Sequence, residues 1–367
     1  MTTTPVSRAL RLVDELADAQ LDALVVTDLH DIRWLTGFTG SNAVVLVAAG
    51  DGTPVLRFLT DFRYVTQAAE QVPDDWERID GGRDLGGAGI ATHLPDGVSR
   101  LGFDDGHLTV AAHRRLADAL PDGVELVGAG DAVRRLRAVK DEGEVARIRA
   151  SAELADAAFT QVVLEGPVVG RTERELAIDL ETAMRRLGAS GPSFDSIVAA
   201  GAHGALPHAS PRDVAIPSGV LLTVDWGAIL DGYCSDCTRT IATGPVDGLE
   251  REVYGVVLDA QRRSLAAVRA GAGARDVDAV ARELIAAAGY GDRFGHGLGH
   301  GVGLEIHEAP TLSPRGSGVL RAGEIVPVEP GIYLPGELGV RIEDLAVVTA
   351  DGSEVLNTLD KELLVLG

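Results

Sequence analysis

The sequence predicts two domains: an α/β domain over residues 1–137 and an α+β domain over residues 138–367. Its length of 367 residues exceeds what a single ordinary hydrophobic core serves. In the first part, short apolar runs alternate with helix-like runs. In the second part, longer helical patterns flank strands that carry acidic residues. Length, alternation and the change of pattern near residue 138 together set the predicted fold class.

The first part has the pattern of one compact α/β unit. Residues 1–20 are typical of an amphipathic helix, and residues 22–27 form the apolar run of a buried strand. The other expected elements are strands at 43–48, 53–60, 100–104 and 125–128, and helices at 62–71 and 110–119. Because no glycine-rich phosphate loop follows any of these strands, a nucleotide-binding domain is not predicted.

The charged stretch RRLRAVKD, residues 134–141, marks the predicted junction, and a helix pattern follows at 144–163. Thr172 and Glu175 form a capping box, which starts a helix that is expected to end near Gly188. Two more helices are expected at 249–270 and 276–288, with strands between and after them. The second part therefore reads as helices around a sheet.

Composition indicates which binding partners and which cellular compartment to expect. The net charge of −22 argues against binding to nucleic acid or anionic membranes, since both require a basic surface. No apolar run is long enough to span a bilayer, and the N-terminus lacks the apolar core of a signal peptide. The two cysteines fit a reducing compartment. A cytoplasmic protein is predicted.

Two hairpins each offer a pair of facing carboxylates. Folding the segment 221–240 about residues 230–231 places Asp225 opposite Asp236. Folding the segment 326–344 about residue 336 places Glu329 opposite Glu343. Directly opposed strand residues share a face, with Cβ atoms about 4.5–5.5 Å apart. Buried carboxylates this close repel one another unless a cation or a proton lies between them.

A glycine-rich segment, GHGLGHGVGLEIHE at residues 295–308, holds three of the nine histidines, namely His296, His300 and His307. Its glycines exclude the helical arrangement of zincins and favour an extended backbone close to a ligand. In an extended segment His296 and His300 face the same side. Four carboxylates with one imidazole suit two divalent ions, and the oxygen-rich set favours Mn²⁺, with Co²⁺ or Zn²⁺ as alternatives.

Two other kinds of site are disfavoured. Cys234 and Cys237 have the spacing of a redox or zinc motif. In an extended strand, however, residues three apart lie about 10 Å from each other on opposite faces, too far for a disulfide. No serine lies in a nucleophile elbow, so a serine hydrolase triad is not predicted.

The segments VDWGAILDGYCSDCTRT, GHGLGHGVGLEIHE, VEPGIY and VRIED, in this order, resemble the pita-bread metallopeptidases, the group of aminopeptidase P, prolidase and methionine aminopeptidase. WLTGFTGSNA and TDFRY resemble the N-terminal domain of the Xaa-Pro peptidases, so the resemblance covers almost the whole chain. It implies a creatinase-like N-terminal domain and a pita-bread (creatinase/aminopeptidase) catalytic domain.

The resemblance also implies roles for individual residues. It implies that the metal ligands are Asp225, Asp236, His300, Glu329 and Glu343. It implies that Glu329 is also the proton shuttle and that His208, His296 and His307 lie on the substrate side, with Arg341 beside them.

The implied reaction is metal-dependent hydrolysis of the bond between an N-terminal residue and a proline in second position. In it Glu329 passes a proton to the proline nitrogen, and His307 and His208 bond the carbonyl oxygen.

The choice between aminopeptidase P and prolidase rests on one position. Several prolidases carry an arginine just after the His-Glu-x-Pro segment, where it can pair with a dipeptide's carboxylate. Here His307-Glu308-Ala309-Pro310 is followed by Thr311, which favours an Xaa-Pro aminopeptidase that accepts longer peptides. Arg315 is close enough in sequence to keep the Xaa-Pro dipeptidase alternative open.

Two other functions within the group are less favoured. A methionine aminopeptidase is less favoured because that enzyme lacks a counterpart of the 137-residue N-terminal domain. Some relatives kept the fold as binding modules without metals, and a non-catalytic peptide-binding role stays as a remote alternative. The resemblance also implies a homodimer or a higher homo-oligomer.

Overall fold

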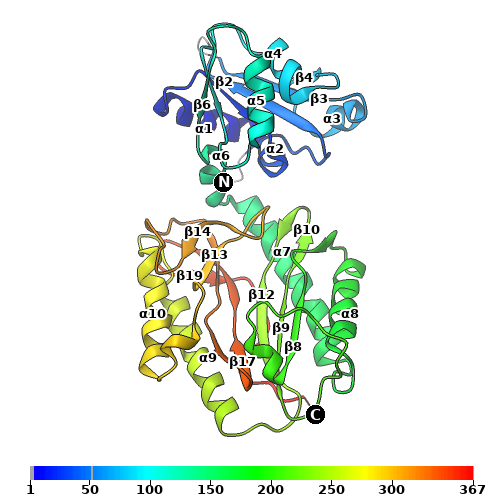
Figure 1. Cartoon of the computed structure of the whole chain (residues 1–367), viewed down its shortest axis with the longest axis vertical. Helices are drawn as coiled ribbons and strands as arrows, with labels where there is room; N and C mark the ends of the chain where they lie inside the picture. Colours follow the sequence, from blue (N-terminus) through cyan, green and yellow to red (C-terminus); the bar gives the residue numbers. More distant parts are fainter. Residues whose placement is uncertain (1–3, 51–52, 367) are drawn as a thin grey trace. The chain divides into compact units, whose positions relative to one another are not determined.

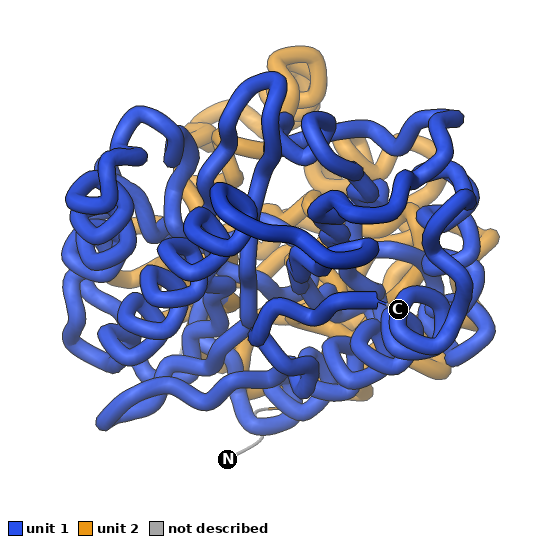
Figure 2. Tube along the Cα trace, turned by 90° about the horizontal axis from the view of Figure 1, so that it is seen from below, with its two compact units in different colours: residues 1, 138–367 blue, residues 2–137 orange. Residues whose placement is uncertain are grey.

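The computed structural model of the chain describes residues 4–50 and 53–366. Expectations for residues 1–3, 51–52 and 367 lie outside the described residues; they concern the start of the first predicted helix and the outer ends of the two predicted domains. The chain forms two compact units, residues 2–137 and residues 138–367 (Figure 2). Each unit has its own sheet structure and its own hydrophobic core.

A six-stranded mixed sheet forms the first unit, in the order β4-β3-β2-β1-β5-β6 (Figure 1). Its strands are β1 (Ala23–Val26), β2 (Ala43–Ala48), β3 (Val55–Thr60), β4 (Glu77–Asp80), β5 (Arg100–Phe103) and β6 (Glu125–Gly128). Its helices are α1 (Pro5–Asp18), α2 (Leu29–Thr36), α3 (Val65–Gln71), α4 (Ile90–Thr92, after a π-helical turn at Leu85–Gly89), α5 (Val110–Ala119) and α6 (Ala132–Ala138). All residues of β1 and β2 are buried, which explains their unbroken apolar runs.

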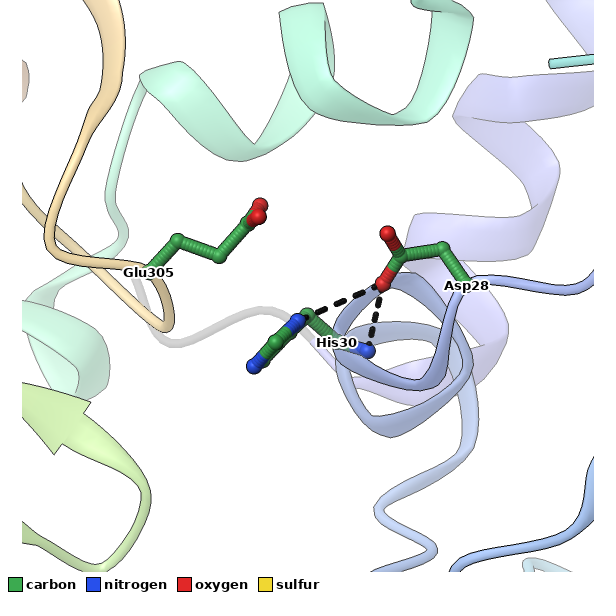
Figure 3. Close-up of side chains that lie close together, drawn as sticks. All are labelled: Asp28, His30 and Glu305. Atoms are coloured by element: carbon green, nitrogen blue, oxygen red, sulfur yellow. Dashed lines mark hydrogen bonds and ion pairs between the residues drawn. The ribbon is translucent and has the colours of Figure 1, made fainter. Parts of the chain in front are cut away.

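The helix α2 is the main element of this unit that periodicity does not predict. Asp28 caps its start: one carboxylate oxygen accepts a hydrogen bond from the backbone N–H of His30 at 2.8 Å and lies 3.4 Å from the ring Nδ1 of the same histidine (Figure 3). Gly37, with φ of +80°, ends the helix. Eight residues are too few for a clear helical period, so the two end signals carry the information. The charged stretch expected as the junction is also partly helical, because α6 continues to Ala138.

The second unit combines four long helices with short strands. The helices are α7 (Glu142–Phe159, continued by a π-helical turn at Thr160–Leu164), α8 (Glu173–Arg186), α9 (Leu249–Ala267) and α10 (Ala274–Ala287), and the 3₁₀ turns are Gly201–Ala205 and Gly291–Arg293. The strands are β7 (Gly191–Pro192), β8 (Ile197–Ala200), β9 (Leu221–Trp226), β10 (Ala228–Leu230), β11 (Tyr233–Cys234), β12 (Cys237–Ala242), β13 (Gly299–Gly301), β14 (Glu308–Leu312), β15 (Ile325–Val328), β16 (Gly331–Leu334), β17 (Leu338–Arg341), β18 (Asp344–Val348) and β19 (Ser353–Val355). The predicted capping box of α8 is confirmed: Thr172 and Glu175 each accept the other's backbone N–H. Over the described residues, no helix is both long enough and apolar enough to cross a bilayer.

The second unit is built from two halves, each with its own core. In the first half α7 and α8 pack on β8, β9 and β12, where Trp226 stacks on Phe159 with ring centres 4.2 Å apart. In the second half α9 and α10 pack on the strands between residues 298 and 348. Figure 1 shows α8 on one side of the central strands and α9 and α10 on the other. Strands of the two halves meet between these helix pairs, where the Glu343 amide donates to the Thr238 carbonyl oxygen at 3.1 Å.

The register of the first acidic hairpin differs from the prediction. Thr238, not Asp236, lies opposite Asp225, because Leu230 pairs with Tyr233 and the turn is centred on Asp231 and Gly232. Both of these residues have positive φ, 48° and 79°, as the tight turns of twisted hairpins require. The shift is two residues, so Asp225 and Asp236 still share a face.

The register of the second acidic hairpin is confirmed. Val328 pairs with Asp344 before Glu329, and Gly331 pairs with Arg341 after it. Both pairs correspond to a fold about Gly336, as predicted, with φ of +81° at that glycine. Glu329 and Glu343 therefore lie across from each other, at the break between the two ladders.

Candidate active site

An acidic cluster lies where the two halves of the second unit meet. Asp225 stands near the end of β9, Asp236 just before β12, and Glu343 between β17 and β18. One carboxylate oxygen from each of these three residues lies within 4.8 Å of the others. Glu329, between β15 and β16, and His300, in β13, face the same cluster. All five predicted metal ligands therefore come together, from five different strands or strand junctions.

His300 presents an unprotonated nitrogen to this cluster. Its Nδ1–H donates to the carbonyl oxygen of Gly301 at 3.0 Å, which leaves Nε2 as the acceptor. That Nε2 lies 3.6 Å from Asp236 Oδ2 and 3.7 Å from Glu329 Oε1. Burial lowers the pKa of His300 to about 4, so the ring is neutral at physiological pH. A lone pair aimed between two carboxylate oxygens is the arrangement of a metal-binding imidazole.

The carboxylates of the cluster are held in an unfavourable electrostatic state when no cation is present. Burial, followed by the charge of Asp225, raises the pKa of Glu343 to about 8. Burial and the charge of Glu343 raise the pKa values of both Asp236 and Glu329 well above their usual range. Among the described residues Asp225 Oδ1 is buried and has no hydrogen-bond partner. A divalent cation would remove the repulsion and satisfy this oxygen, so the residues fit the metal site that their types predict.

Arg341 supplies the positive charge next to the cluster. Its guanidinium donates to Asp225 Oδ2 at 2.6 Å, to the Tyr333 hydroxyl at 2.9 Å and to Thr238 Oγ1 at 3.0 Å. The side chain is only 4% exposed, so these contacts fix it rigidly. Arg341 thus holds one oxygen of Asp225, while the other oxygen stays available.

His296 lies on the other side of Tyr333. Its Nδ1–H donates to the Gly297 carbonyl oxygen at 2.8 Å, so its Nε2 accepts from the Tyr333 hydroxyl at 2.9 Å. Burial lowers the pKa of His296 to about 4. Its Nδ1 is also 4.0 Å from Glu329 Oε2. Arg341, Tyr333 and His296 form a continuous chain of hydrogen bonds along one wall of the site.

Two cavities meet at the acidic cluster. The first has a volume of about 350 Å³ and the second about 270 Å³. Both are lined by His208, Asp225, His300, His307 and Glu329. The His307 ring packs edge-on against His300, with ring centres 4.4 Å apart. Every histidine predicted for the substrate side therefore lines at least one cavity.

The two cavities differ in chemistry. The wall of the first includes the apolar residues Phe194, Ile197 and Ile306. The second contains Arg341 and ends near Thr311 and Ser313. Thr311 thus lines the second cavity, whereas Arg315 is exposed and lines neither cavity.

The cysteines take no part in this site. Both are free and buried, and Cys237 directs its thiol to the carbonyl oxygen of Glu343 at 3.6 Å. Burial raises the pKa of the Cys234 thiol to about 12, which removes it from thiolate chemistry at physiological pH.

Sequence reasoning missed several residues of the site. Tyr333 joins His296 to Arg341, and Phe194 and Ile306 line the first cavity. Tyr333 had a local signal, since it follows Glu329 by an even number of residues and so falls on the same side of an extended chain. Phe194 comes from a distant loop, and nothing in its own segment indicates the cavity.

Comparison with known proteins agrees with this geometry. Residues 146–350 match the metallopeptidase family M24, and residues 8–139 match the creatinase/prolidase N-terminal domain. An uncharacterized peptidase of Bacillus subtilis, YqhT, is 42% identical over 346 residues, which cover 94% of this chain and 96% of that protein.

Two solved structures resemble the whole chain. The Xaa-Pro dipeptidase from Bacillus anthracis has a TM-score of 0.94 at 39% identity and covers 99% of this chain and 100% of its own. The X-Pro aminopeptidase from Thermotoga maritima has a TM-score of 0.88 at 34% identity, covering 98% and 100%. The predicted pita-bread fold is thereby confirmed. With a family match over most of the second unit and relatives that span its full length, the chain belongs to metallopeptidase family M24.

Proposed function

We propose that this protein is a metal-dependent exopeptidase that hydrolyses the bond between an N-terminal residue and a proline in second position. The observation that carries the proposal is the arrangement of four carboxylates and the neutral His300 at the meeting point of two cavities. The names of the two similar structures, an Xaa-Pro dipeptidase and an X-Pro aminopeptidase, supply the substrate class.

Asp225, Asp236, His300, Glu329 and Glu343 would hold two divalent ions, with Mn²⁺ favoured by the oxygen-rich donor set. When bound, such ions lower the pKa of a water molecule and polarise a carbonyl group. The remaining chemistry belongs to the side chains around them.

Glu329 would move the proton. Its half-buried carboxylate lines both cavities and lies 3.7 Å from His300 Nε2, and a carboxylate beside the attacking water can take a proton from it. In the proposed reaction it passes this proton to the proline nitrogen, because that nitrogen must be protonated to leave as an amine.

His307 and His208 flank the position of the scissile carbonyl. Both line the two cavities, and an N–H from either ring would donate to the oxygen on which negative charge develops. His296 is engaged through both ring nitrogens within the protein, so in our proposal it acts by holding Tyr333 and the wall of the second cavity. Arg341 orients Asp225 beside the substrate amine through its hydrogen bond to Oδ2.

The cavities set the substrate's direction. The apolar residues of the first cavity, Phe194, Ile197 and Ile306, suit the side chain of the N-terminal residue. The second cavity then receives the proline and whatever follows it, towards Thr311.

We infer that longer peptides are preferred over dipeptides. Among the described residues that line the second cavity, Arg341 is the one guanidinium, and it is already bound to Asp225 and Tyr333. Among the described residues of this cavity there is no second arginine and no lysine to pair with the carboxylate of a dipeptide, which is the proline's own carboxylate. The name of the Bacillus anthracis structure favours the second candidate, an Xaa-Pro dipeptidase.

One comparison tests both proposals. Hydrolysis of an Xaa-Pro dipeptide and an Xaa-Pro-Yaa tripeptide would be measured with added Mn²⁺ and after chelation. The aminopeptidase proposal expects higher kcat/KM for the tripeptide, and a tenfold preference for the dipeptide would establish the second candidate instead. Peptide binding without hydrolysis at any metal content would show a binding protein.

We also infer a cytoplasmic protein that works as a homodimer or a higher oligomer. The two cysteines are free and buried, which fits a reducing compartment and supports the first inference. Light scattering of the purified protein tests the second.

A further inference from the structure

His208 lies on a segment that has little regular structure of its own. The segment 206–214 connects the 3₁₀ turn Gly201–Ala205 to the strand β9 and contains neither helix nor strand. His208 itself is exposed at a turn, yet it lines both cavities. Two backbone bonds close the turn, from Leu206 N–H to His203 O at 3.1 Å and from Ala209 N–H to Leu206 O at 3.2 Å, and side-chain contacts hold the segment on either side of it.

Glu173, the first residue of α8, forms hydrogen bonds with residues on both sides of His208. Its side chain is only 1% exposed. It accepts hydrogen bonds from His203 Nδ1 at 2.9 Å and from Arg212 through Nε and Nη2, both at 3.0 Å. The backbone N–H groups of Arg212 and Ala200 donate to it as well, each at 3.0 Å. Glu173 thus binds one residue before His208 and one residue after it.

Helix capping does not account for this buried carboxylate. The start of α8 is already capped by Thr172 and Glu175 through their reciprocal bonds. Glu173 instead directs its side chain away from the helix, to the segment 200–212. A buried charge with its partner is weak evidence for stability, so these contacts call for another role.

A second contact fixes the inner side of the same segment. Arg341 Nη1 donates to the carbonyl oxygen of Pro207, next to His208, at 3.3 Å. Further out, backbone bonds from Arg174 N–H to Arg212 O and from Glu173 N–H to Val214 O join the segment to α8 at 3.1 and 3.2 Å. Loss of the Glu173 side-chain contacts would therefore loosen the turn at His208 without detaching the whole segment.

We propose that Glu173 is a positioning residue that fixes His208 between the two cavities by binding His203 and Arg212 on either side of it. This inference rests on the proposed function, in which His208 donates to the carbonyl oxygen of the substrate. A donor that meets charge developing in the transition state must be placed to within a fraction of an ångström, and a misplacement of about 1 Å can cost roughly a hundredfold in rate.

The test uses Arg212→Ala, because Arg212 is 46% exposed and its removal leaves the core intact. Arg174→Ala is the matched control: it removes an exposed ion pair to Asp213 on the same segment, at 2.9 Å, and leaves the Glu173 contacts in place. Glu173→Gln, with Glu175→Gln as its control in the same helical turn, tests the carboxylate directly.

Arg212→Ala and Glu173→Gln are expected to lower kcat for an Xaa-Pro-Yaa peptide about ten- to a hundredfold, with KM and bound metal nearly unchanged. Both controls should stay within about twofold of the unmodified enzyme. When His208 is already replaced by alanine, adding Arg212→Ala should lower kcat by less than about twofold, because the two changes act through one side chain. A full, additive loss in that background would overturn the proposal.

Hydrogen exchange tests the positioning role of Glu173 independently of the proposed function. Arg212→Ala should speed exchange of the hydrogen-bonded amides at positions 206, 209 and 212 at least tenfold and leave the rest of the unit unchanged, whereas Arg174→Ala should not. If no Xaa-Pro peptide is cleaved by the unmodified enzyme, the proposed function is wrong and the exchange data alone decide the positioning role. Unchanged exchange in Arg212→Ala would refute it.

Discussion

The stability of the metal-free protein should fall as the pH rises from 6.5 to 8. Burial and the charge of Asp225 raise the pKa of Glu343 to about 8 in the folded protein, against 4.5 for the free side chain. Between these values the folded state holds a proton that the unfolded state has lost, so each pH unit removes about 1.4 kcal/mol per retained proton. Over 1.5 pH units the loss is roughly 2 kcal/mol for one proton, a sizeable part of the ~5–15 kcal/mol that stabilises most proteins.

The choice of pH window follows from the other buried groups. His296 and His300 have pKa values lowered to about 4, so the unfolded state binds their protons more tightly and they make stability rise with pH. That opposite effect weakens as the pH rises through about 6.5, the ordinary pKa of histidine, and is nearly complete about one pH unit above it. Asp31 of the first unit, with its pKa raised to about 6 by burial, has also lost its proton by then. Above pH 6.5 the carboxylates of the site dominate.

The assay is urea unfolding of metal-free protein at pH 6.5, 7.0, 7.5 and 8.0, with and without Mn²⁺. Metal ions replace the protons, so with Mn²⁺ at 100 times its Kd the protein should gain about 2.7 kcal/mol and the decline should disappear. Glu343→Gln, which stays neutral at every pH, should flatten the metal-free profile. Stability that is constant or rising between pH 6.5 and 8 in the metal-free protein would refute the assignment of these carboxylates as a repelling cluster.

Three further outcomes are expected. Asp236→Asn should lose bound metal and activity, whereas Cys237→Ser should keep both in metal analysis and peptide assays; equal losses would contradict the separate roles of these neighbours. Thr311→Arg should shift the preference towards Xaa-Pro dipeptides by about ten- to a hundredfold in kcat/KM, since a charge-assisted hydrogen bond contributes roughly 1.5–3 kcal/mol; an unchanged ratio of dipeptide to tripeptide rates would show that Thr311 lies away from the product side. Tyr333→Phe should break the link between Arg341 and His296 and lower kcat about tenfold at constant metal content, and an unaffected kcat would mean that this chain of hydrogen bonds is dispensable.

The predictability of this site from sequence follows from which contacts are local. Glu329 and Glu343 lie on one hairpin, and alternation of side chains along its strands was enough to place them face to face. For the hairpin of Asp225 and Asp236, the predicted register differs from the observed one by two residues, because Asp231 and Gly232 occupy the two central turn positions. The face was still right, since a shift of two residues preserves side-chain direction.

Contacts between distant segments could not be read from the chain. The bonds of Glu173 to His203 and Arg212 join residues 30 and 39 positions apart, and no periodicity couples them. Phe194 enters the first cavity for a similar reason, through the packing of its loop rather than through its own segment. The short helix α2 is not predicted because its eight residues make only about two turns, too few to show a clear helical period.

The ligands of the acidic cluster belong to both halves of the second unit, and this has a consequence for how the protein is made. Asp225 and Arg341, which are bonded in the finished site, stand 116 residues apart in the sequence. The first half has a core of its own and carries Asp225 and Asp236, which are only part of the acidic cluster. The cluster is complete only once β15 to β18 are in place, so divalent ions held as proposed above would bind late in biosynthesis and would then link two halves that have separate cores.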